Sequence, residues 1–224
     1  IVAWYYGIYS AASAMVAAQD GSFQDDHTST ANAWDRQFSA LGRVISPFSL
    51  RVSTLVESSF KEEIITIKAG ISFDLTSKPT NSTEAFGSCC AYLSGSAAWW
   101  KWKTEENIRA SREFKALNVT DFRKKAAREL RDNRLGGKAV SFLHQAFRYR
   151  GKANYREALF LGYGDYVETL LSEYVDDLSS VLRGFVAMSG AFACKRLGQA
   201  IWNEFVEDLD VHRSFQLSPK SIWV

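Results

Sequence analysis

The stretch that decides the fold lies near the start of the chain, where residues 4–12 read WYYGIYSAA. Apolar side chains recur there and beyond at intervals of three or four residues, which predicts a helix with a buried face. A second apolar stripe, which includes Tyr5 and Tyr9, indicates that this helix is buried on most sides. The residues of the first stripe are Trp4, Ile8, Ala11, Met15 and Ala18.

Helical spacing returns in later parts of the chain and makes a mainly α fold the expectation. We expect Asn118 or Thr120 to cap the basic helix that ends near Gly136. The predicted helices after the first cover residues 31–41, 86–108, 122–134, 138–149, 166–185 and 191–209.

One segment breaks this pattern, because apolar and polar residues alternate from Ile65 to Leu75. A two-residue period predicts a half-buried strand, and residues 50–56 form a weaker strand candidate. We therefore expect residues 46–80 to be an insertion that contains a small β-hairpin. The chain of 224 residues fits a single domain over residues 1–224.

Charge is unevenly distributed, although the net charge is only +2. Eleven Lys and Arg residues lie between Arg123 and Arg156, against only Glu129 and Asp132. Residues 157–182 hold six acids and no Lys or Arg. This segregation predicts a basic surface, or a basic and an acidic stretch that pair with each other.

Several classes of protein find no support in the sequence. Cys89, Cys90 and Cys194 lack metal-ligand spacing, and we expect buried free thiols in a reducing cytoplasm. No run is long and apolar enough for a membrane span.

Phosphate-loop, nucleophile-elbow and dinucleotide-binding motifs are absent, so no cofactor and no metal is predicted. Ile1 falls inside a predicted helix, so we expect further residues upstream.

Two distant segments together resemble the signature regions of HEPN domains, a family of small helical bundles. The first is residues 4–12, followed after a loop by Asp26, His27 and Thr28. The second is residues 148–155, which read RYRGKANY and precede a long amphipathic segment. The resemblance implies a HEPN-like helical bundle, a homodimer, and a role in RNA binding or processing of a prokaryotic defence or toxin–antitoxin type.

Active members of this family use an Arg followed four to six residues later by a His, and no Arg of this chain has a His at that spacing. The resemblance places Arg150 and Tyr155 at the matching positions, and Tyr is a poor base at neutral pH. His144, close in sequence to Arg150, is the best candidate for an acid or base if the chain cleaves RNA. Such cleavage would be independent of metal ions. The expected catalytic residues are His144, Arg150 and Tyr155, and the expected nucleic-acid-binding residues are Arg148, Lys152, Arg128 and Arg131.

Each of these residues also has a plain structural interpretation. Arg150 would pair with a carboxylate of the acidic stretch, and His27 would anchor a loop. Residues 99–103 read WWKWK, a mixture that suits either single-stranded nucleic acid or a helix–helix interface. Two hypotheses follow: an RNA-directed protein, and a non-catalytic dimerisation or regulatory module that binds a protein partner such as an antitoxin, or a nucleotide.

Overall fold

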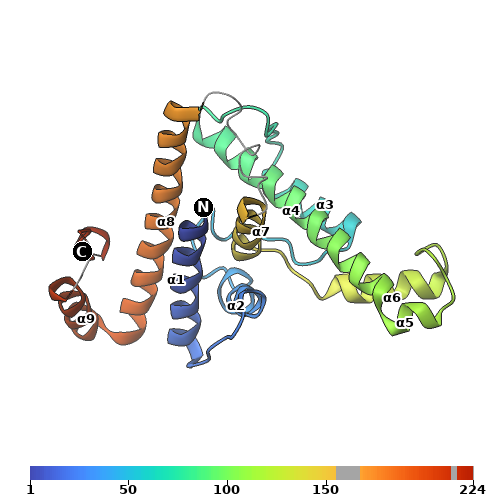
Figure 1. The fold of residues 1–224 in the computed structure, drawn as a ribbon, viewed down its shortest axis with the longest axis horizontal. Coiled ribbons are helices and arrows are strands. Elements are labelled where there is room, and N and C mark those ends of the chain that lie inside the picture. The colour runs from blue at the N-terminus through green and yellow to red at the C-terminus, as the bar shows by residue number, and fades with distance from the viewer. Residues whose placement is uncertain (155–166, 213–215, 224) are drawn as a thin grey trace. The chain divides into compact units, whose positions relative to one another are not determined.

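The computed structural model describes residues 1–154, 167–212 and 216–223, and over these residues the chain is mainly helical, as predicted (Figure 1). Within the described part, no helix is long and apolar enough to cross a membrane. The helices are α1 (Val2–Asp20), α2 (His27–Trp34) with the π-helical turn η1 (Asp35–Ser39), α3 (Glu57–Lys68), α4 (Ser82–Ala110), α5 (Arg112–Ala116), α6 (Lys125–Gly136), α7 (Phe142–Asn154), α8 (Val167–Leu197), α9 (Gln199–Val211) and α10 (Lys220–Trp223).

The chain divides into two compact units. Unit 1 comprises residues 1–38 and 146–224, and unit 2 comprises residues 39–145. Both units are helical, and the expectation of a single domain stays a prediction. The boundary falls within α7, between Gln145 and Ala146, so the candidate residues on that helix belong to different units.

Unit 1 is built on α1 and α8, which lie side by side and run in the same direction (Figure 1). Near the start of α1, a Cβ atom at Gly7 would lie 2.8 Å from the side chain of Leu182. One turn further, Ser189 Oγ donates a hydrogen bond of 3.1 Å to the carbonyl of Ala11. The small residues that the sequence places on α1 therefore allow its close approach to α8.

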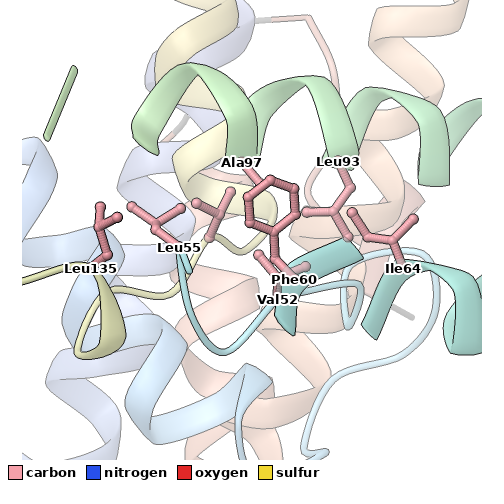
Figure 2. Close-up of a cluster of buried hydrophobic side chains, with 8 residues drawn as sticks. Val52, Leu55, Phe60, Ile64, Leu93, Ala97 and Leu135 are labelled. Carbon is pink, nitrogen blue, oxygen red and sulfur yellow. The ribbon is translucent and has the colours of Figure 1, made fainter. Parts of the chain in front are cut away.

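Unit 2 has its core between α3 and α4 (Figure 2). Phe60 and Ile64 of α3 pack with Leu93 and Ala97 of α4, all at most 7% exposed. The segments that flank this pair are joined by backbone hydrogen bonds between Val52 and Val140, of 2.9 and 3.0 Å. A smaller apolar cluster, which includes Ile108, Phe114 and Ala127, holds α5 and α6 together.

The predicted β-hairpin within residues 46–80 is wrong. Helix α3 takes in residues 57–64, between the two strand candidates, and residues 65–68 of the second one, whereas residues 69–75 are turn and irregular structure. The buried face of α3 presents Phe60 and Ile64 with the partly buried Ile67. The alternation continued past the helix because Ile71 and Phe73 pack on α4, where a Cβ at Gly87 would lie 3.0 and 2.9 Å from them. A helical stripe followed by two packed loop residues thus imitated a two-residue period.

The predicted cap of the basic helix is also wrong. Helix α6 begins after Lys124, which makes no side-chain cap hydrogen bond. Asn118 instead adopts a left-handed conformation with φ of 49° in the preceding loop. Side-chain caps do begin α2 and α4, where Asp26 and Asn81 accept hydrogen bonds from the first-turn amides.

Candidate functional site

An aromatic cluster in unit 1 forms around the imidazole of His27. Asp26 caps α2 by accepting hydrogen bonds of 2.8 Å from the amides of Thr28 and Ser29, which fixes His27 as the first residue of that helix. The His27 ring centre lies 4.3 Å from that of Tyr9 and 5.3 Å from that of Tyr5. The start of α2 is thereby held against α1.

Helix α7 brings Arg150 to the same cluster. Its Cζ lies 5.4 Å from the ring centre of Tyr5 and 5.2 Å from that of Tyr6, and its Nη2 donates to the Tyr6 hydroxyl at 3.2 Å. Both distances are typical of cation–π contact. We call Tyr5, Tyr6, Tyr9, His27 and Arg150 the tyrosine–arginine site.

Two neighbours of Arg150 in sequence hold α7 in place. Phe147 packs on His27, with ring centres 5.7 Å apart. Tyr149 lies edge-on to Trp4 of α1 at 6.1 Å, and its hydroxyl is 2.6 Å from that of Tyr174 on α8. Phe147 thus joins α7 to α2, and Tyr149 joins it to α1 and α8. The position of Arg150 on α7 is therefore set by packing contacts at neighbouring residues.

The tyrosine–arginine site is buried at Tyr5 and exposed to solvent at Tyr6. Tyr5 is 2% exposed, whereas Tyr6 is 42% exposed, and His27 and Arg150 are half-buried. The Tyr6 side chain is therefore accessible to a ligand, beside a guanidinium whose position is already fixed.

Burial is the main cause of the shifted pKa values of Tyr5 and His27. Desolvation raises the pKa of Tyr5, although the Arg150 charge opposes this, so Tyr5 keeps its proton. Burial and then the Arg150 charge lower the pKa of His27, against a smaller opposing effect of Asp26. His27 is thus kept neutral at neutral pH, and its buried Nδ1 has no hydrogen-bond partner among the described residues.

These groups offer three kinds of chemistry at one place. The Arg150 guanidinium provides hydrogen-bond donors and a positive charge for an anion such as a phosphate. The Tyr6 ring provides a stacking surface. The neutral imidazole of His27 is a form that can accept a proton. Within the described residues, no group of three or more His, Cys, Asp or Glu side chains is arranged to hold a metal ion.

The predicted catalytic His144 does not lie in this cluster. It belongs to unit 2, is 5% exposed, and its Nδ1 accepts a hydrogen bond of 3.3 Å from the Ser141 amide. Its ring packs edge-on against Trp100, with centres 6.0 Å apart. These contacts are those of a core histidine, and the prediction that His144 is catalytic has no support in its surroundings. Tyr155 lies outside the described residues.

The predicted nucleic-acid-binding residues are spread over both units. Arg148 is half-buried on α7, and Lys152 follows one turn later on the same helix. Arg128 is exposed on α6. Arg131, also on α6, forms an ion pair of 2.8 Å with Asp132 and lies over the ring of Phe122.

Sequence reasoning missed Tyr5, Tyr6 and His27 as site residues, and interpreted His27 as a loop anchor. The available signal was the pairing of residues 4–12 and 26–28 with residues 148–155, which meet at Arg150 in the structure. No protein-family model, curated protein or solved structure matches the chain.

Proposed function

We propose that this chain binds single-stranded RNA, with a phosphate at Arg150 and a base against the ring of Tyr6. The observation that carries the proposal is the guanidinium of Arg150, held over the rings of the buried Tyr5 and the exposed Tyr6. Proteins that bind single strands combine cations that contact the backbone with aromatic rings on which bases stack.

The placement of Arg150 suits a phosphate better than an internal ion pair. None of the ion pairs between described residues involves Arg150, and its Nε is buried without a hydrogen-bond partner in that part of the chain. Its one described hydrogen bond goes to a neutral hydroxyl. A guanidinium that is oriented but not neutralised loses little conformational entropy when an anion binds.

A second surface supports the same proposal. Residues 109–138 of unit 2, the basic lobe, carry ten Lys and Arg residues against four Asp and Glu residues. Arg128, Lys124 and Lys138 are exposed on this lobe. Such an excess of positive charge adds affinity for a nucleic-acid backbone without reading its sequence.

RNA cleavage is a second candidate activity, favoured by the position of His27. Its neutral imidazole packs against the same tyrosine rings as Arg150. A neutral imidazole can accept the proton of a ribose 2′-hydroxyl, while a nearby guanidinium offsets charge on the phosphate. Incubation of a labelled RNA with the protein in EDTA tests this, and cleavage that is lost in His27→Gln is the expected result. Intact RNA removes this candidate and leaves the binding proposal in place.

Binding is tested by fluorescence anisotropy with a labelled mixed-sequence RNA of about 12 nucleotides, within the range of known single-strand sites. The variant Arg150→Gln is compared with Arg183→Gln, an exposed arginine of the same unit. We expect a large loss of affinity in Arg150→Gln alone. No salt-dependent binding by the native chain would contradict the proposal and favour a non-catalytic regulatory module.

A further inference from the structure

Unit 1 contains an apolar cavity that lies outside the tyrosine–arginine site. Its volume is about 420 Å³, which falls within the range of small-molecule sites. One wall is a row of small residues on α1, which includes Ala11, Ala14 and Ala18. Three aromatic side chains contributed by α9 and α10 line it as well: Trp202, Phe205 and Trp223.

The aromatic wall is held in place by specific contacts. The Trp223 indole donates a hydrogen bond of 2.9 Å to the carbonyl of Val186, and its ring centre lies 5.2 Å from that of Trp202. A Cβ atom at Gly190 would lie 2.3 Å from Trp223 Nε1, so only glycine admits the indole there. Lys220 anchors the same short helix by ion pairs with Glu207 at 2.5 Å and Asp210 at 3.6 Å.

Two polar groups in the cavity wall are already used within the protein. Ser189 Oγ donates to the carbonyl of Ala11, and the Trp223 Nε1 hydrogen bond goes to Val186. An extended polypeptide that entered this space would leave its backbone amide and carbonyl groups short of partners, at a cost in free energy. A hydrocarbon chain needs no such partners, so the cavity favours an aliphatic ligand.

Positive charge lies next to two residues of the cavity wall, Ala18 and Leu197. Arg196 adjoins the lining residue Leu197, and its Nε and Nη2 donate to the carbonyls of Ala18 and Gln19 at 3.2 and 3.1 Å. These bonds orient the guanidinium and leave Nη1 for another acceptor. The exposed Lys195 precedes it in the chain. An aliphatic ligand with an anionic head group would match this arrangement.

We propose that the cavity binds a free fatty acid, with the acyl chain along the small residues of α1 and the carboxylate at Arg196. An apolar protein cavity of about 150 Å³ holds a benzene molecule. The cavity of unit 1 has nearly three times that volume, about 420 Å³, so it has room for an acyl chain. The proposal is independent of RNA binding, because it uses neither Arg150 nor Tyr6.

The test is a calorimetric titration of the chain with dodecanoate. Ala14 is exposed and lines the cavity, so Ala14→Phe fills the space without disturbing the core, and Ala191→Phe is a matched control on an exposed position of α8 outside the lining. We expect saturable binding by the native chain and Ala191→Phe, and at least about tenfold weaker binding by Ala14→Phe. Circular dichroism confirms that each variant is folded.

A separate experiment tests the contact between Arg196 and the carboxylate. Arg196→Gln should weaken dodecanoate by about tenfold, as expected for loss of a charge-assisted hydrogen bond, and leave the affinity for dodecanol unchanged. Absence of saturable dodecanoate binding, or equal binding by Ala14→Phe and the native chain, would overturn the proposal. A third outcome would also overturn it: the native chain sediments as a dimer, Ala14→Phe sediments as a monomer, and neither binds fatty acid. A second copy of the chain would then occupy the cavity.

Discussion

Arginines lie over aromatic rings in both units, but with different electrostatic partners. In unit 2, Arg109 and Arg131 lie 5.0 and 5.6 Å from the ring centre of Phe122, and they are paired with Glu106 and Asp132. In unit 1, Arg150 contacts two tyrosine rings at similar distances and has no carboxylate partner among the described residues. A ring contact is therefore common to both units, and what distinguishes Arg150 among the described residues is that no carboxylate there pairs with it.

The largest expected effect concerns the ring that the unit 2 arginines share. Phe122 packs on Phe114 with ring centres 5.1 Å apart, within the small core that joins α5 and α6. Phe122→Ala should lower the free energy of unfolding by about 2–4 kcal/mol, because it removes a partly buried aromatic side chain. Tyr6→Ala should cost less than about 1 kcal/mol, because Tyr6 is exposed. Urea unfolding followed by circular dichroism measures both, and equal losses would contradict the contrast.

The next effect concerns RNA affinity. Arg150→Gln should weaken RNA binding by about tenfold to a hundredfold, the range expected when a charge-assisted hydrogen bond of about 1.5–3 kcal/mol is lost. Arg131→Gln should change it by less than about threefold, because Asp132 already neutralises that charge. Fluorescence anisotropy compares the two variants. Equal effects would mean that the paired and the unpaired arginine are equivalent.

A smaller effect separates the ring of Tyr6 from its hydroxyl. Tyr6→Ala should weaken RNA binding by about fivefold, because stacking of a base on an aromatic ring contributes about 1–3 kcal/mol. Tyr6→Phe keeps the ring and loses only the acceptor of the Arg150 hydrogen bond, so its affinity should stay within about twofold of the native value. If Tyr6→Phe weakens binding as much as Tyr6→Ala, the ring is not a stacking surface.

The smallest effect is a pH dependence of stability. Burial lowers the pKa of His27 in the folded chain, so the unfolded chain binds more protons in the window between that lowered pKa and about 6.5. The free energy of unfolding should therefore rise with pH in this window, by at most about 1.4 kcal/mol per pH unit. His27→Gln should remove this contribution, as measured by urea unfolding at a series of pH values. An unchanged slope would show that His27 does not titrate as described.

Most helices were predictable because their burial follows their own local sequence. The stripe from Trp4 to Ala18 and the stripe that begins at Phe86 correspond to α1 and α4. The strand prediction failed where two kinds of environment followed one another. Ile67 belongs to the packed face of α3, whereas Ile71 and Phe73 pack against Gly87 from a loop. Sequence periodicity cannot distinguish these cases, because the difference lies in tertiary contacts.

The tyrosine–arginine site was only half predictable. Arg150 was predicted from the resemblance of residues 148–155 to a family signature, but its neighbours in the site, Tyr6 and His27, lie more than a hundred residues away in the sequence. The expected partner was the nearby His144, and the fold buries that residue against Trp100. Closeness in sequence misled here because residues six apart on a helix point in different directions, while packing of α7 on α1 joins distant segments.

The most direct test of the central claim is the salt dependence of RNA binding. Each phosphate contact with a single strand contributes about 0.7 to the slope of log K against log salt concentration. We predict that Arg150→Gln lowers the magnitude of this slope by about that amount, and that Arg183→Gln leaves it unchanged. An Arg150→Gln slope equal to that of the native chain would show that Arg150 holds no phosphate, and would contradict the account.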